Sequence, residues 1–156
     1  MQHLRAEIDL PDPAATEALG ARIARVLATG DAVALAGDLG AGKTALARSI
    51  LRALGVAEDV PSPTFTLVQV YETPGLTVSH FDLYRVGRES ELDELGFDDA
   101  LASGAVLVEW PERAPDRIPG DALHVHLSDA GASARRAVLA GCGRWTPLFA
   151  AEGAHG

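Results

Sequence analysis

The sequence predicts a three-layer α/β fold, in which helices cover both faces of a mixed, mostly parallel central sheet. Short apolar runs typical of strands alternate with amphipathic helical patterns, and one wholly apolar run leads through a glycine-rich loop into a helix. A turn pattern also joins two of the later strands. The 156 residues suit one domain over residues 1–156, with a poorly defined tail over about 144–156.

The first part of the chain predicts two strands and two helices. Asp12 and Pro13 are typical of the N-cap and first residue of a helix, and Gly30 and Gly55 follow the ends of the two helical patterns. A run without polar residues, as in the second strand, is typical of a strand buried on both faces of a parallel sheet. The expected elements are strands at 4–10 and 32–36 and helices at 13–27 and 43–54.

The later part predicts mainly strands. Residues 73–75, Thr-Pro-Gly, predict a hairpin turn. Ser90 with Asp93 resembles a capping box for a short helix. His124 and His126 alternate with apolar residues, so we expect them on the exposed face of a strand, binding nothing. The expected strands are 66–71, 76–82, 105–108, 123–127 and a last one around 138–139.

Composition narrows the classes of function. The apolar content of 47% and charged content of 22% predict a folded protein, and no apolar run reaches the length of a membrane span. A net charge of −9 argues against strong direct nucleic-acid binding, which needs clustered cations. One cysteine, Cys142, predicts neither a disulfide nor a metal cluster and is consistent with a reducing cytoplasm. Of 13 basic residues, Lys43 is the one lysine.

That lysine lies in the most informative stretch of the chain. Residues 37–44, Gly-Asp-Leu-Gly-Ala-Gly-Lys-Thr, match the phosphate-binding loop pattern GxxxxGK[ST] between a predicted strand and a predicted helix. The glycines allow backbone N–H groups to surround phosphate, Lys43 supplies charge, and the Thr44 hydroxyl is suited to Mg²⁺. The fold is therefore expected to be a P-loop NTPase fold. The predicted nucleotide-binding residues here are Asp38, Leu39, Gly40, Ala41, Gly42, Lys43, Thr44 and Ala45.

A P-loop enzyme also needs a carboxylate near the metal. Asp82 and Glu109 end two predicted strands, and strand carboxyl ends face the ligand crevice of an open α/β sheet. Both are candidate magnesium ligands and catalytic groups; alternatively, Asp82 is a turn cap and Glu109 ordinary surface. Thr64 lies in the loop after the P-loop helix, where nucleotide switches place a hydroxyl, unless this loop is only stiffened by proline.

ATP is favoured by elimination. The guanine-recognition motif N/TKxD of Ras-like GTPases needs a lysine outside the P-loop, and the chain has none.

Four blocks together closely resemble the bacterial TsaE (YjeE) family. They occur in the order and spacing of that family, and the resemblance covers roughly residues 11–140. The blocks are residues 37–44, Ser-Pro-Thr-Phe-Thr-Leu-Val at 62–68, His-Phe-Asp-Leu-Tyr-Arg at 80–85 and Val-Glu-Trp-Pro at 108–111.

The resemblance implies a small cytoplasmic ATPase required for N6-threonylcarbamoyladenosine formation at position 37 of tRNAs that read codons starting with A. Such a protein acts on a TsaB–TsaD heterodimer, supports its turnover through ATP hydrolysis, and meets tRNA only through that complex.

The resemblance also assigns roles to individual residues. It makes Thr44 and Glu109 magnesium ligands, Asp82 the Walker B-type acid and Thr64 a switch threonine. Glu109 is in addition the candidate for activating the attacking water. Two further nucleotide contacts are implied outside these blocks: Thr16 near the base, and Arg135 or Arg136.

Other interpretations stay open at this stage. One is a small-molecule P-loop kinase, for which residues 85–88 would supply the arginines of a lid. Another is a nucleotide-gated adaptor whose hydrolysis is incidental. The six acids of residues 89–99 are either a solvated face or a docking surface for the heterodimer.

Overall fold

The computed structural model describes residues 3–38, 40–63, 65–132 and 134–149. Leu39 and Thr64, two of the predicted site residues, lie outside this described part. The strands are β1 (His3–Leu10), β2 (Ala32–Ala36), β3 (Val68–Thr73), β4 (Leu76–Asp82), β5 (Ala105–Glu109), β6 (Leu123–Asp129) and β7 (Arg135–Cys142). The α-helices are α1 (Pro13–Val26), α2 (Lys43–Ala53), α3 (Glu91–Glu94) and α4 (Phe97–Ser103), and 3₁₀ turns span Pro111–Arg113, Pro115–Arg117 and Gly143–Trp145.

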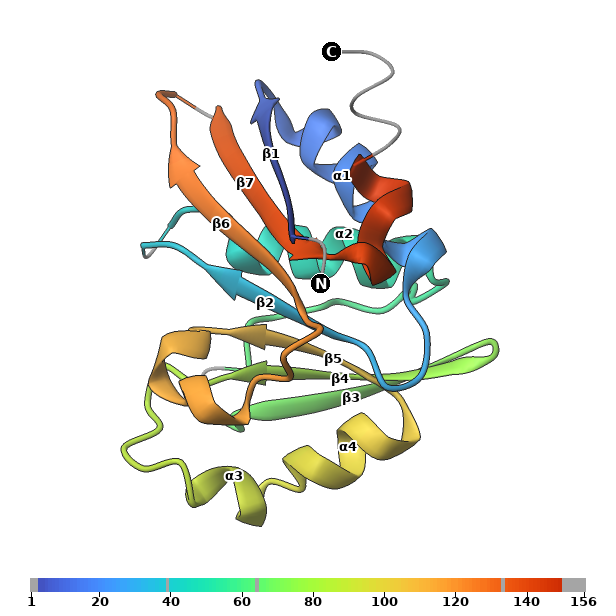
Figure 1. Ribbon diagram of the computed structural model, residues 1–156, viewed down its shortest axis with the longest axis vertical. Coiled ribbons are helices and arrows are strands. Elements are labelled where there is room, and N and C mark those ends of the chain that lie inside the picture. Colours follow the sequence, from blue (N-terminus) through green and yellow to red (C-terminus); the bar gives the residue numbers. More distant parts are fainter. Residues whose placement is uncertain (1–2, 39, 64, 133, 150–156) are drawn as a thin grey trace.

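One seven-stranded sheet runs through the molecule in the order β1-β7-β6-β2-β5-β4-β3 (Figure 1). Its centre is parallel, because β2 pairs in parallel with both β6 and β5, and β5 with β4. The edges are antiparallel, through β1–β7, β7–β6 and β3–β4. This confirms the predicted mixed sheet. It also places the carboxyl ends of β2, β4 and β5 side by side at one edge, where a ligand crevice forms in such sheets.

Helices cover both faces of the sheet, as predicted. Leu107 packs into a core with Ile23 of α1 and Ile50 of α2. Val108, which points the opposite way on the same strand, packs with Phe97 of α4 in a second core. Figure 1 shows the pair α1 and α2 against one side of the sheet and α3 and α4 beside β3, β4 and β5. The molecule therefore has three layers.

Local signals in the sequence explain several element ends. Asp12 caps α1 by accepting a hydrogen bond from the Ala15 N–H, 2.9 Å from N to Oδ1, and Pro13 is the first helical residue. Gly75, at φ +80°, closes the two-residue turn between β3 and β4, where Thr73 pairs with Leu76. These predictions are confirmed.

Other predictions are corrected. The strand predicted from residue 66 begins at Val68, because the Leu67 N–H is turned back to Pro63 O at 2.8 Å with φ +67°. Ser90 makes no side-chain cap and has helical backbone angles, so the capping box with Asp93 is wrong. Helix α4 was not predicted, since its seven residues are too few for a clear period.

The predicted loose tail differs from the structure over its described part. Trp145 and Leu148 are buried in the core with α1, and the Trp145 Nε1–H donates to Asp121 O at 2.8 Å. Residues 150–156 lie outside the described residues. Large apolar side chains therefore anchor residues 144–149 to the domain.

His124 and His126 are exposed on β6, as expected. No helix in the described part of the chain is long and apolar enough to cross a membrane.

Candidate nucleotide site

The glycine-rich loop joins the end of β2 to the start of α2. Gly37, Gly40 and Gly42 have φ values of +140°, +80° and +105°, a region that favours glycine. A Cβ on Gly37 would also lie 2.4 Å from Leu127 O. Gly42 precedes α2 and leaves the first turn of the helix without a side-chain cap. The loop and the helix N-terminus thus form a cradle of backbone N–H groups suited to a phosphate.

Lys43 is folded back over this loop. Its side chain is buried, with 5% of the residue exposed, and its Nζ donates to Gly37 O at 2.6 Å and Asp38 O at 2.9 Å. Nζ also lies 4.2 Å from the centre of the Trp110 ring. Burial lowers the pKa of the Lys43 ammonium, while the charges of Glu109, Glu112, Asp82 and Asp38 act in the opposite direction. The buried Lys43 ammonium is held by neutral carbonyls, and a phosphate that replaced them would bind directly to its positive charge.

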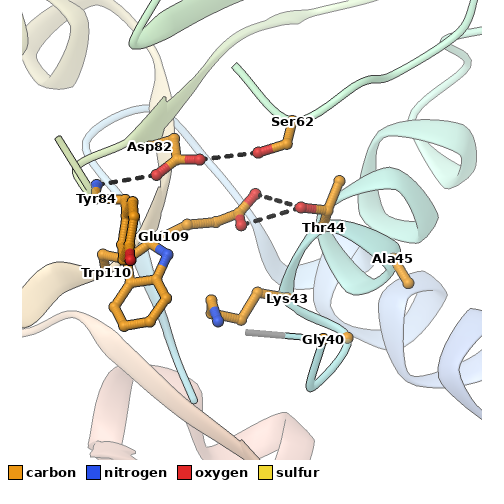
Figure 2. A pocket seen from close by; sticks show the side chains of 10 residues that line it. Gly40, Lys43, Thr44, Ala45, Ser62, Asp82, Tyr84, Glu109 and Trp110 are labelled. Carbon is orange, nitrogen blue, oxygen red and sulfur yellow. Dashed lines mark hydrogen bonds between the residues drawn. The ribbon is translucent and has the colours of Figure 1, made fainter. Parts of the chain in front are cut away.

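Two carboxylates reach the same place from neighbouring strands. Asp82 and Glu109 are direct partners in the β4–β5 register. The Thr44 hydroxyl lies 3.0 Å from each carboxylate oxygen of Glu109, and Asp82 accepts hydrogen bonds from Ser62 Oγ at 2.8 Å and the Tyr84 N–H at 3.0 Å (Figure 2). The structure therefore brings together the hydroxyl and the two acids that the sequence selected separately.

These groups line a cavity of about 430 Å³. Its lining includes the rings of Tyr84 and Trp110, whose centres lie 4.8 Å apart, and Trp110 holds a left-handed backbone with φ +62°. Figure 2 shows Lys43, Thr44 and Glu109 facing this space. The lining residues are Gly40, Gly42, Lys43, Thr44, Ala45, Ser62, Asp82, Tyr84, Glu109 and Trp110.

A second cavity, of about 720 Å³, adjoins the other side of Gly42 and Ala45 and contains both Thr16 and Arg135. Arg135 lies on the P-loop, since its Nη2 donates to Gly40 O at 3.2 Å. Arg136 instead bonds Asp9, 3.2 Å from Nε to Oδ1. The structure thus places Arg135, and not its neighbour, beside the loop, and it brings Thr16 from α1 to the same cavity.

Asp38 and Ala41 complete the predicted set, and neither lines the cavities. Asp38 contributes its carbonyl to Lys43, and Ala41 is buried beneath the loop with its N–H bonded to Asp38 O at 3.0 Å. Both therefore shape the loop.

Several neighbours of the site were not predicted as site residues. Ser62 binds Asp82, the rings of Tyr84 and Trp110 line the cavity, and His80 contacts Glu109, 2.6 Å from Nε2 to Oε2. One signal for His80 was available: it lies two residues before Asp82 in a strand, so both side chains share a face. A polar residue that shares a strand face with a predicted site acid indicates a contact inside the site.

The donor set fits a hard cation held partly by phosphate. A hydroxyl and one or two carboxylates are the usual protein share of a Mg²⁺–nucleotide site. No group of three or more His, Cys, Asp and Glu side chains suited to a metal occurs within the described residues, so a site made wholly of protein side chains is not indicated there. The glycine cradle likewise fits a phosphate chain.

Comparison with known proteins agrees with this geometry. Residues 10–138 match the model of the family described as "Threonylcarbamoyl adenosine biosynthesis protein TsaE". The tRNA threonylcarbamoyladenosine biosynthesis protein TsaE of Bacillus subtilis is 35% identical over 142 residues, covering 90% of this chain and 89% of that protein. The TsaE protein of Rickettsia felis is 44% identical over 113 residues, covering 72% of this chain and 66% of that protein.

A solved structure shares the fold. The crystal structure of YdiB from the same Bacillus species aligns with a TM-score of 0.81 at 27% identity, covering 99% of this chain and 98% of that one. The family match spans most of the chain, including β2, α2, β4 and β5. This confirms the resemblance found in the sequence: the chain belongs to the TsaE family of threonylcarbamoyladenosine biosynthesis proteins.

Proposed function

We propose that the protein is a Mg²⁺-dependent ATPase that supports N6-threonylcarbamoyladenosine formation at adenosine 37 of tRNAs reading codons that start with A. The observation that carries the proposal is the contact of the Thr44 hydroxyl with Glu109 beside Lys43, at the end of a glycine cradle. A P-loop, a hydroxyl and two strand-end acids are the parts that ATP hydrolysis needs.

The residues divide this work by their chemistry. The backbone of residues 37–42 and the start of α2 would hold the phosphates, and Lys43 would exchange the carbonyls of Gly37 and Asp38 for phosphate oxygens. Thr44 and Glu109 would hold Mg²⁺, with Asp82 nearby. The metal, when bound, supplies neutralisation of the charge that develops on the phosphates. Glu109 would also orient the attacking water, a role supported by its position in the lining of the cavity.

The second cavity is the candidate position of the nucleoside. It begins where the P-loop cradle ends, at Gly42 and Ala45, and is lined by Thr16 and Arg135. A guanidinium plane, which stacks on a base, and a hydroxyl, which hydrogen-bonds, suit a nucleoside. Thr64 remains a proposed switch residue on sequence grounds alone.

The biological setting follows from the family and the charge. We propose a cytoplasmic protein that binds a TsaB–TsaD heterodimer and stimulates its turnover, with tRNA held by that complex. The net charge of −9 supports indirect contact with RNA, since phosphate neutralisation needs clustered cations.

The test is reconstitution of the protein with the heterodimer and tRNA, comparing wild type with Glu109→Gln. We expect Glu109→Gln still to bind ATP, at a raised Mg²⁺ concentration, but to lose turnover by at least about 100-fold, because the change removes a metal-binding carboxylate and the group that orients the attacking water in the transition state. Glu112→Gln is the matched control, since Glu112 is exposed and does not line the cavity.

The outcomes separate the candidate functions. Full tRNA modification by Glu109→Gln would favour the nucleotide-gated adaptor. ATP-dependent phosphorylation of a small acceptor without any partner protein would favour the kinase. Wild-type protein with no ATPase activity, alone or in the reconstituted complex, would contradict the proposal.

A further inference from the structure

His80 is buried inside the sheet and touches the acid at the centre of the site. Its side chain is 0% exposed and that of Glu109 is 3% exposed, and 2.6 Å separates His80 Nε2 from Glu109 Oε2. The residue lies on β4, whose neighbour β5 carries Glu109. Glu109 is therefore held from two directions, by His80 within the sheet and by Thr44 on α2.

The hydrogen bond assigns the direction of donation. A carboxylate has no proton to donate, so in its contact with Glu109 Oε2 the Nε2 of His80 is assigned as the donor, in the tautomer that carries the proton on Nε2. Nδ1 is buried without a hydrogen-bond partner among the described residues. A buried polar atom left unpaired costs stability, so an apolar side chain would suit this strand position better for folding alone.

His80 does not line the cavity at the P-loop, so it has no route to the nucleotide itself. His80 contacts one carboxylate oxygen of Glu109, and the same carboxylate accepts the Thr44 hydroxyl. A side chain that hydrogen-bonds a metal-binding carboxylate fixes the rotamer of that carboxylate. Loss of such a side chain commonly lowers metal affinity or activity about 10- to 100-fold.

We infer that His80 is a positioning residue, which holds the Glu109 carboxylate in the orientation required for Mg²⁺ and for the attacking water. The inference rests on the ATPase function proposed above. It predicts an effect on the metal requirement and on turnover, with little effect on the affinity for nucleotide in the absence of metal.

The test compares His80→Leu, which fills space without a donor, with His80→Gln, whose side-chain amide can still donate to Glu109. We expect His80→Leu to lower kcat about 10- to 100-fold with the KM for ATP changed less than about threefold, and to raise the Mg²⁺ concentration for half-maximal ATP binding several-fold by calorimetry. His80→Gln should recover most of both losses. Ser79→Ala is the control, since Ser79 is buried in the same strand and faces the other way.

A second measurement separates positioning from a general structural role. In a Glu109→Gln background, His80→Leu should have no further effect on Mg²⁺-dependent binding, because its target has been removed. Equal loss in both backgrounds, or equal loss in the Gln and Leu variants, would overturn the inference. If His80→Leu does not fold, His80→Met takes its place with the same expectations. If the wild-type protein hydrolyses ATP and the His80 variants have the same kcat and Mg²⁺ requirement as wild type, only this inference is rejected. An inactive wild-type protein would reject the proposed function.

Discussion

The two helical layers of this protein are built differently. Helices α1 and α2 have 14 and 11 residues and approach so closely that a Cβ on Gly20 would lie 2.5 Å from the Cβ of Ser49. Helices α3 and α4, which form the thin layer, have four and seven residues and attach to the sheet through Leu92 and Phe97. Their acids are exposed except Glu91, which is half-buried.

The difference shows where the fold needs rigidity. Helix α2 carries the P-loop and Thr44, whose position relative to Glu109 sets the geometry of the site. Its close packing on α1 leaves little room for movement. The acids of α3 and α4 do not contact the site: Asp93 and Asp98 both pair with Arg117, at 2.8 Å and 3.0 Å, and Glu91 accepts the Gly87 N–H at 3.1 Å.

The largest effect should come from Phe97, which anchors α4 in the thin layer to the sheet. Phe97 is fully buried and meets the Phe81 ring edge-on, with centroids 5.0 Å apart. We expect Phe97→Ala to lower the free energy of unfolding by about 3–5 kcal/mol. Phe65→Ala is the control in urea unfolding, since Phe65 is 81% exposed. A loss below about 1 kcal/mol at Phe97 would show that the thin layer contributes little to the core.

The next effect concerns Lys43, the first residue of α2. Lys43→Arg keeps the charge, but the broader guanidinium does not fit between the carbonyls of Gly37 and Asp38 and the Trp110 ring. We expect turnover to fall on the order of 100-fold, about 2.7 kcal/mol, in a steady-state ATPase assay. Arg25→Lys, on the exposed end of α1, should leave the rate unchanged. Wild-type turnover by Lys43→Arg would contradict this account of the lysine.

A smaller effect should arise at the contact between α1 and α2. Gly20→Ala would place its Cβ against Ser49 and 2.9 Å from Ile50 N, so we expect a loss of about 1–3 kcal/mol in thermal or urea unfolding. Adding Ser49→Gly should restore part of that loss. Gly120→Ala is the matched control, because nothing lies within 4 Å of a Cβ there. If Gly20→Ala is as stable as wild type, the two helices are less tightly packed than described.

The smallest effect on folding should come from the exposed acids. Replacing Glu94 and Asp99 by lysine should change the free energy of unfolding by less than about 0.5 kcal/mol. Replacing Asp93 and Asp98 by lysine alters net charge equally but removes both ion-pair partners of Arg117, so about 1 kcal/mol more should be lost.

The same two variants test the docking hypothesis for residues 89–99. Both should weaken binding to the TsaB–TsaD heterodimer in a titration at moderate salt, since both reverse charges on that surface. Unchanged affinity in both would leave the acids as a solvated face.

Much of the site followed from local patterns. The P-loop was recognisable because each of its roles needs a particular residue type at a particular spacing, and Asp82 and Glu109 were predicted because each ends a predicted strand. His80, Ser62 and Tyr84 were not predicted as site residues, because their roles come from contacts across 29, 20 and 26 residues of chain. The choice between Arg135 and Arg136 likewise depended on which side chain of β7 turns toward the loop.

The sequence by itself determined the alternation of strands and helices, the phosphate-binding loop and the family, since these rest on spacing along the chain. Tertiary structure alone decided the strand order, the second helix of the thin layer and the anchoring of residues 144–149 by Trp145. It also decided that Thr44, Glu109 and His80 form one hydrogen-bonded chain. The physical reason is that burial and hydrogen bonding between distant segments depend on the packed arrangement, which no local pattern contains.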